Sequence, residues 1–98
     1  MTDLRKLAKG RPCMIRLPGC DGGGETTVLA HYRLAGTGMG RKPPDLCGAW
    51  ACAPCHDRVD GRTKAVGVSA ILLERTHAEG CLRTLAALAE EGYTLVKK

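Results

Sequence analysis

Two cysteines followed by a histidine are the most specific chemical signal in this sequence. Cys52 and Cys55 form a CxxC motif, and His56 comes directly after it. Two thiolates on such a tight turn can bind one zinc ion at Zn–S distances of about 2.3 Å. A tetrahedral site needs two more ligands, for which Cys13 and Cys20 are the best candidates because a proline-glycine turn precedes Cys20. We therefore predict a structural Zn²⁺ site on these four cysteines.

Other interpretations of these residues stay open. A CxxC pair can be a redox centre, although the thioredoxin-like βαβ context of such pairs is missing here. Cys47 could replace one of the four ligands, although it fits an ordinary residue of an alternating strand. His56 could also replace a cysteine in the zinc site. Cys81 falls on the apolar face of a C-terminal helix and is most simply a small core residue.

If four cysteines complete the zinc site, His56 is available for catalysis. Asp60 follows it by four residues on the same helical face, so the two side chains could share a second, hard divalent ion. His31 ends a predicted strand, and a strand–loop–strand–helix unit could bring it to His56. A histidine can take a proton from water, and a metal ion beside it can neutralise a phosphate. This set indicates a minimal phosphodiester hydrolase, unless His31 is an ordinary strand residue and Asp60 a solvent-facing one.

The elements that must position these residues follow from turn signals and hydrophobic periodicity. The C-terminal third predicts a helix that begins near Ile71 and is closed by Gly92, with Gly80 as a potential interruption. The remaining expected elements are a short helix over 4–9, an extended piece over 13–17, strands over 26–32 and 46–51, a short helix over 55–60 and a final strand over 93–96.

The composition explains why a metal would be needed. The 98-residue chain has no phenylalanine, and aromatic residues make up only 3% of it, so its core must be thin. Small domains often compensate with a bound metal, and a structural zinc can contribute on the order of 10 kcal/mol. Trp50 is expected in this core, beside the zinc knuckle.

The charge distribution points to a partner. Residues 1–64 hold 11 Lys and Arg against 6 Asp and Glu, and they also hold five of the six cysteines. The excess positive charge therefore coincides with the predicted chemistry, which favours nucleic acid as the partner, although it could merely keep the protein soluble. No apolar segment reaches the roughly 20 residues of a membrane span, and the N-terminus carries no signal core. We expect a cytoplasmic protein without a membrane partner.

The motifs also resemble a known family. Ala30-His31-Tyr32-Arg33, Pro44-Asp45-Leu46 and the segment 52–56 resemble the HNH motif of the ββα-metal, or His-Me finger, nucleases. The whole chain is similar to the small YbcO-like nucleases of phages and prophages, through residues 3–6, 44–46 and 51–57. The resemblance implies an α+β fold, with a zinc-bound ββα-metal core of treble-clef-like type and a helical C-terminal layer. It implies one domain over 1–98, with the core at 13–60 and the helical scaffold at 66–98.

The resemblance also implies roles. The protein would be an endonuclease that hydrolyses phosphodiester bonds in nucleic acid, with DNA as the expected substrate. His31 resembles the general base, and His56 the ligand of a catalytic Mg²⁺ or other divalent ion. Asp45 stands where the family has a residue that braces the histidine loop, and Asp60 stands near an optional third metal ligand. Ala30 replaces a residue that often binds this metal, so that ligand is either missing or supplied by Asp45 or Asp60.

Basic residues around this core would contact the phosphate backbone, which favours low sequence specificity. The alternative to an enzyme is a non-catalytic zinc module that binds nucleic acid or a protein partner, and Ala30 is the feature that supports it. The candidate nucleic-acid contacts are Arg33, Arg41, Lys42, Arg58 and Arg62.

Overall fold

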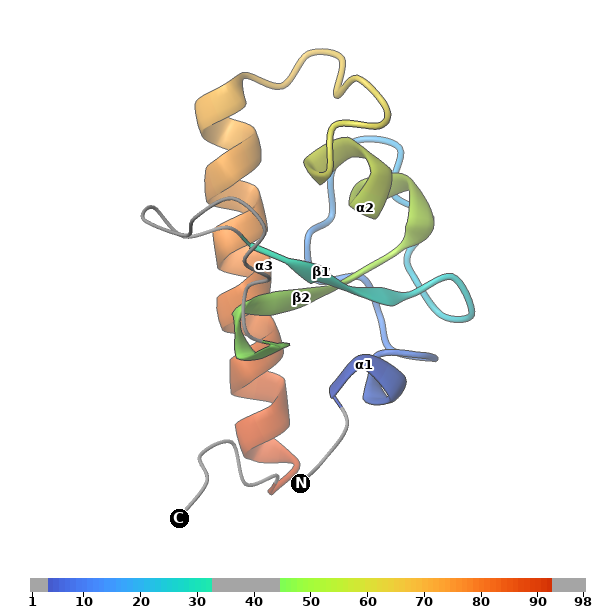
Figure 1. The fold of residues 1–98 in the computed structure, drawn as a ribbon, viewed down its shortest axis with the longest axis vertical. Helices are drawn as coiled ribbons and strands as arrows, with labels where there is room; N and C mark the ends of the chain where they lie inside the picture. The colour runs from blue at the N-terminus through green and yellow to red at the C-terminus, as the bar shows by residue number, and fades with distance from the viewer. Residues whose placement is uncertain (1–3, 33–44, 93–98) are drawn as a thin grey trace.

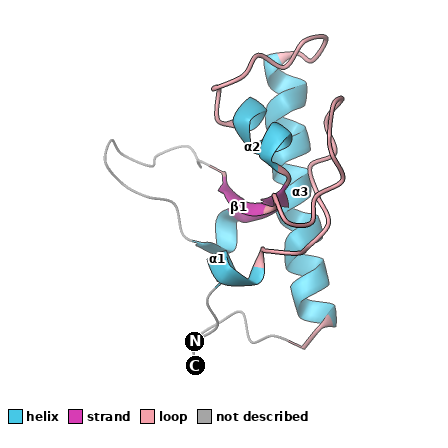
Figure 2. Ribbon diagram, turned by 90° about the vertical axis from the view of Figure 1, so that its right-hand side faces the viewer, coloured by secondary structure: helices cyan, strands magenta, loops and turns pink. Residues whose placement is uncertain are grey.

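The computed structural model describes residues 4–32 and 45–92, in which a two-stranded sheet is surrounded by helices (Figure 1). Two antiparallel strands lie between α1 on one side and α2 on the other, and α3 runs past both strands (Figures 1 and 2). This arrangement confirms the predicted small α+β class. The elements in chain order are α1 (Leu4–Leu7), β1 (Val28–His31), the 3-10 helix η1 (Asp45–Cys47), β2 (Gly48–Ala51), α2 (Ala53–Val59) and α3 (Ala70–Glu90).

The second strand is shorter than predicted. The sequence favoured a strand over 46–51, but η1 occupies residues 45–47 and β2 begins at Gly48. The prediction that Cys47 is a strand residue is therefore wrong. Its carbonyl oxygen instead accepts hydrogen bonds from the backbone N–H of Tyr32, at 2.7 Å, and from the thiol of Cys81, at 3.4 Å. The predicted strand over 93–96 lies outside the described residues.

The strand β2 is buried along its whole length because neighbours cover both of its faces. Its register with β1 pairs His31 with Gly48 and Ala30 with Ala49. A side chain at Gly48 would collide with Leu29, since a Cβ there would lie 2.6 Å from the Leu29 Cγ. Small residues in β2 thus let β1 and α3 approach closely.

The core consists of two clusters. One is made largely of cysteine and alanine, and Ile15 and Leu17 add branched side chains to it. The other surrounds Trp50, which packs with Ala8 and Leu88. The expectation that Trp50 is a core residue is confirmed, since its side chain is almost fully buried, but it packs in this second cluster and not in the one that contains the predicted zinc ligands.

The helix α3 runs unbroken through Gly80. The missing side chain at this position allows the N-terminal segment to approach the helix closely. A Cβ at Gly80 would lie 3.0 Å from a side-chain carbon of Ile15 and 3.1 Å from the Met14 carbonyl oxygen. Ser69 is the N-cap of the helix, and its hydroxyl accepts the Leu72 N–H. Within the described residues, no helix is both long and apolar enough to cross a membrane.

Thr84 connects this helix to the sheet. Its buried hydroxyl accepts the backbone N–H of Trp50 at 3.0 Å and donates to the carbonyl oxygen of Gly80 at 2.8 Å. The Trp50 carbonyl accepts the backbone N–H of Met14 at 2.7 Å. Both polar backbone groups of Trp50 therefore bond away from β1, which closes the outer edge of the sheet.

We expect Thr84→Val to lower the free energy of unfolding by about 1–3 kcal/mol, because the isosteric side chain leaves the Trp50 N–H buried without an acceptor. Thr84→Ser keeps the hydroxyl and serves as the matched control, with a smaller loss from the missing methyl group. Urea denaturation followed by circular dichroism measures both variants. A Thr84→Val protein as stable as the wild type would contradict this role.

Candidate functional site

Four cysteine thiols converge at the junction of β2 and α2. The sulfur atoms of Cys13, Cys20, Cys52 and Cys55 all lie within 4.8 Å of one another, and all four cysteines are free of disulfides. The sulfurs of Cys20 and Cys52 are 3.6 Å apart. A tetrahedral zinc ion with Zn–S bonds of about 2.3 Å separates its sulfurs by about 3.8 Å. The cluster can therefore hold one metal ion, and its four-thiol donor set is the one that structural zinc uses.

Local backbone geometry explains how the long spacing between Cys13 and Cys20 is accommodated. The Cys20 N–H donates to the carbonyl oxygen of Leu17, which closes a turn just before the second ligand. Backbone N–H groups also point at the sulfurs: Arg16 N lies 3.5 Å from the Cys13 Sγ, and Gly22 N lies 3.3 Å from the Cys20 Sγ. Such donors favour the thiolate form, which is the form that binds metal.

Burial and hydrogen bonding act in opposite directions on these thiols. Burial raises the pKa of Cys13, but backbone donors led by the Arg16 N–H outweigh it and bring the pKa to about 7. Burial raises the pKa of Cys52 to about 11 and raises the pKa of Cys55 further. Burial by itself thus keeps Cys52 and Cys55 protonated at neutral pH. A divalent cation would displace those protons and stabilise the thiolates.

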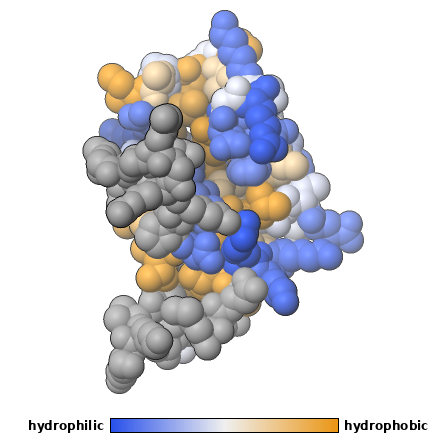
Figure 3. All heavy atoms as spheres, viewed as in Figure 1, coloured by the Kyte–Doolittle hydropathy of each residue, from blue (hydrophilic) through white to orange (hydrophobic). Residues whose placement is uncertain are grey.

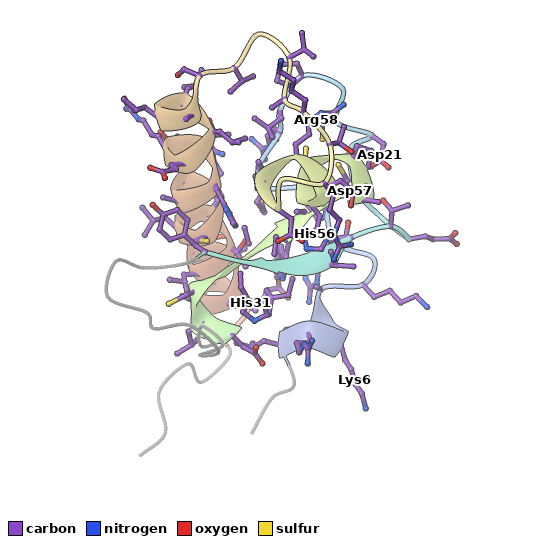
Figure 4. The ribbon with its side chains drawn as sticks, turned by 45° about the horizontal axis from the view of Figure 1, so that its top comes forward. Lys6, Asp21, His31, His56, Asp57 and Arg58 are labelled. Carbon is purple, nitrogen blue, oxygen red and sulfur yellow. The ribbon has the colours of Figure 1, made fainter. Side chains whose placement is uncertain are left out.

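The histidine His56 is separate from this cluster. Across residues 4–32 and 45–92, the four cysteines are the one group of three or more potential ligands that lie close enough to share an ion. Neither His56 nor Cys47 is needed to complete it. His56 lies one residue beyond Cys55 on α2, and it borders a groove of about 580 Å³ that His31 also borders (Figure 4).

His31 is held by a carboxylate. It is the last residue of β1, and its Nε2 lies 2.7 Å from the Oδ1 of Asp45, at the start of η1. The His31 side chain is 16% exposed and that of Asp45 is 40% exposed, so the pair is only partly open to solvent. The structure therefore brings together two residues from separate segments that the sequence predicted to belong to one site.

Asp60 lies elsewhere. It borders a second pocket, of about 290 Å³, together with His31 and His77, and one of its carboxylate oxygens pairs with Arg62 at 3.2 Å. His31 thus borders both cavities, whereas His56 and Asp60 border different ones. Asp60 is the C-cap residue of α2, and its backbone N–H donates to the His56 carbonyl oxygen at 3.0 Å. An ion shared by His56 and Asp60 stays a prediction.

Two of the basic residues that were predicted to contact nucleic acid, Arg58 and Arg62, lie within the described residues. Arg58 packs its guanidinium over the turn that carries Cys20, so closely that a Cβ at Gly19 would lie 2.5 Å from the Arg58 Nη2. Figure 4 shows Arg58 on the side of α2 away from His31. Arg62 is exposed and pairs with Asp60. Arg33, Arg41 and Lys42 lie outside the described residues.

His77 is a structural residue beside the site, and the sequence did not predict its contact with β1. This α3 residue is buried, its Nε2 lies 2.9 Å from the carbonyl oxygen of Ala30, and its ring packs edge-on against Tyr32. Burial lowers the pKa of His77, so a neutral ring that donates to Ala30 fits this position. The helical spacing of His77 from Cys81, by four residues, already places it on the inward face. The bond fixes the backbone next to His31.

Three cations of the N-terminal segment, two in α1 and one just after it, were not predicted as site residues. Arg5, Lys6 and Lys9 border the groove that contains His31 and His56. They lie far from the HNH-like motif in the sequence, and only the packing of α1 beside β1 brings them to the same surface (Figure 1).

The chain is similar to proteins described as nucleases. The family model described as "Putative nuclease YbcO" matches residues 2–93. A protein of Escherichia coli K12 named "Putative nuclease YbcO" is 49% identical over 94 residues, which covers 94% of this chain and 96% of the relative. A protein of Enterobacteria phage 82 with the same name matches equally. A solved structure titled "Structure of a putative bacteriophage protein from Escherichia coli str. K-12 substr. MG1655" gives a TM-score of 0.73 at 44% identity and covers 90% of this chain and 98% of its own.

We expect the purified protein to contain one zinc ion per chain, measured by plasma emission spectroscopy. Cys20→Ser removes a ligand and should abolish zinc binding and cause unfolding, because the metal-binding energy stabilises the fold. Cys47→Ser is the matched control, since Cys47 lies outside the cluster, and it should retain zinc. Equal zinc loss in both variants, or a wild-type protein without metal, would contradict the four-cysteine site.

Proposed function

The chain belongs to the YbcO family of putative nucleases, and from this premise we propose that it is a metal-dependent endonuclease of HNH type that hydrolyses phosphodiester bonds in DNA. One observation supports the proposal above others. His31, which is held by the Asp45 carboxylate, borders the same groove as His56.

The His31–Asp45 contact defines which ring nitrogen can act as a base. An ionised carboxylate only accepts hydrogen bonds, so the His31 Nε2 must carry the proton that Asp45 accepts. The neutral ring then has its lone pair on Nδ1, which can take a proton from water. Asp45 keeps the ring in this tautomer and stabilises the imidazolium that forms. The pair thus has the composition of a general base and its positioning residue.

His56 would supply a protein ligand for the catalytic ion. Mg²⁺ retains several waters and is commonly bound through one or two protein groups together with substrate phosphates, so a single imidazole at the groove is compatible with such a site. When bound there, the ion would neutralise the phosphate charge and stabilise the leaving oxygen. Within the described residues no group of three hard ligands surrounds His56, so phosphate and water would complete the coordination.

The non-catalytic zinc module stays the second candidate because of Ala30. This residue is 1% exposed, and the strand alternation places it on the opposite face of β1 from His31. The position where many relatives of HNH type carry a metal ligand thus faces the core. A binding module predicts DNA affinity without cleavage, which plasmid nicking in the presence of Mg²⁺ or Mn²⁺ tests directly.

We expect His31→Ala to lower the rate of plasmid nicking by about a hundredfold or more, because the general base is removed. Asp45→Asn should lower it by at least about tenfold, since an amide can donate to Nε2 and so favour the tautomer with its proton on Nδ1. Zinc content and the thermal unfolding midpoint serve as folding controls. A His31→Ala protein that folds and nicks at the wild-type rate would overturn the assignment.

His56→Ala should lower the nicking that Mg²⁺ or Mn²⁺ stimulates and shift the titration to higher ion concentration, because the proposed ligand of the catalytic ion is lost. Zinc content should be unchanged, because His56 lies outside the sulfur cluster. The measurement is a titration of nicking rate against divalent ion, paired with zinc analysis of the same preparation. Loss of zinc from His56→Ala would instead identify this histidine as part of the structural site.

A further inference from the structure

The two catalytic candidates, His31 and His56, border a groove of about 580 Å³ that is also bordered by three cations of the N-terminal segment. Its floor is β1, represented by Val28 and Leu29, and its walls come from α1 and α2. In the space-filling view, hydrophilic side chains gather around α1 (Figure 3). The charged and ionisable residues that border the groove are Arg5, Lys6, Lys9, Glu25, His31 and His56.

We propose that this groove binds the sugar–phosphate backbone of the substrate, and that α1 contacts the phosphates next to the one positioned at His31. The inference rests on the proposed function, and it adds a substrate path that the HNH-like motif does not contain. Three cations face one carboxylate along this path, so the groove carries a net positive charge whatever the state of its histidines. A polyanion is the ligand that such a surface attracts.

The packing of α1 against the core fixes the position of these cations. Ala8 is fully buried, and Leu4 and Leu7 pack with it against the Trp50 cluster. Residues at positions i, i+3 and i+4 share one helical face, so burying this face turns Arg5 and Lys6 outward. Lys9 follows the helix, and all three cations are exposed.

The end of α1 is also tied down. The N–H of Gly10 donates to the carbonyl oxygen of Gly24, and the N–H of Gly24 donates to the carbonyl oxygen of Arg11, each at 3.0 Å. The Arg11 guanidinium lies 4.9 Å from the centre of the Trp50 ring and pairs at 2.7 Å with Glu91, the C-cap residue of α3. Arg11 thus stabilises the fold, whereas the three preceding cations border the groove.

The lining of the groove favours backbone recognition. Its floor is aliphatic, and no Phe, Tyr or Trp side chain is among the described residues that line it, so it offers no large aromatic platform for stacking bases. Lys and Arg contacts with phosphates give affinity that depends on salt and little on sequence. The groove therefore fits a nucleic-acid backbone of any sequence.

The test measures DNA binding apart from cleavage. His31→Ala protein, which is expected to leave DNA intact, is titrated with a random-sequence DNA duplex at several NaCl concentrations. In this background, Lys6→Gln and Lys9→Gln should each weaken binding and reduce the slope of log K against log [NaCl] by about 0.9 for one lost phosphate contact. Lys64→Gln, an equal charge change in the exposed loop between α2 and α3, is the matched control and should leave the slope unchanged.

The outcomes separate the two proposals. Equal slopes for Lys6→Gln, Lys9→Gln and Lys64→Gln, or no DNA binding at all, would overturn the groove as the substrate path. Binding of polyglutamate with the same affinity and slope as DNA would also overturn it, by showing a general anion surface. If the slopes fall as expected but the unmutated protein does not nick DNA, the groove stands and the nuclease assignment fails. If nicking occurs and the α1 variants cut and bind normally, only the groove fails.

Discussion

The convergence of four sulfur atoms is the constraint on which the rest of this molecule depends. The cluster links the segment from Cys13 to Cys20 with the first turn of α2, two parts of the chain separated by more than 30 residues. The surrounding core consists largely of alanine and cysteine, which bury little apolar area. A bound zinc would contribute on the order of 10 kcal/mol, which is comparable to the whole free energy of unfolding of a small domain. Since His56 directly follows Cys55, its position on the groove depends on the same cluster.

The C-terminal helix has a comparable effect on His31. His77 bonds the Ala30 carbonyl, Thr84 bonds the Trp50 N–H, and Gly80 allows α3 to approach Met14 and Ile15. These contacts fix both strands of the sheet from one side. The helix that looked like a simple scaffold in the sequence therefore determines where the end of β1 lies. His31 ends β1, and Asp45 lies just before β2. Since α3 fixes both strands, the geometry of the proposed base depends on contacts made by α3, far along the chain.

The sequence was most informative where the chemistry is local. The CxxC spacing and the turn before Cys20 predicted a cluster that the structure confirms as able to hold a metal. Helical periodicity predicted α3 and its end at Gly92. Periodicity did not reveal that His56 and Asp60, on one predicted helical face, border different cavities, because other elements that pack beside α2 form those cavities. Periodicity also did not predict that α1 lies beside the groove, because the spacing of residues along the chain does not encode a tertiary contact.

The two proposed metal sites differ in ways that would keep their ions apart. The cluster offers four soft thiols, three of them buried, and this donor set selects zinc over Mg²⁺. The groove offers an imidazole beside solvent and cations, where a hard ion needs a phosphate to complete its coordination. The structural ion would thus bind during folding and stay, whereas the catalytic ion would arrive with the substrate. The cations of α1 repel a free divalent ion and attract a phosphate chain, so they favour that order of binding.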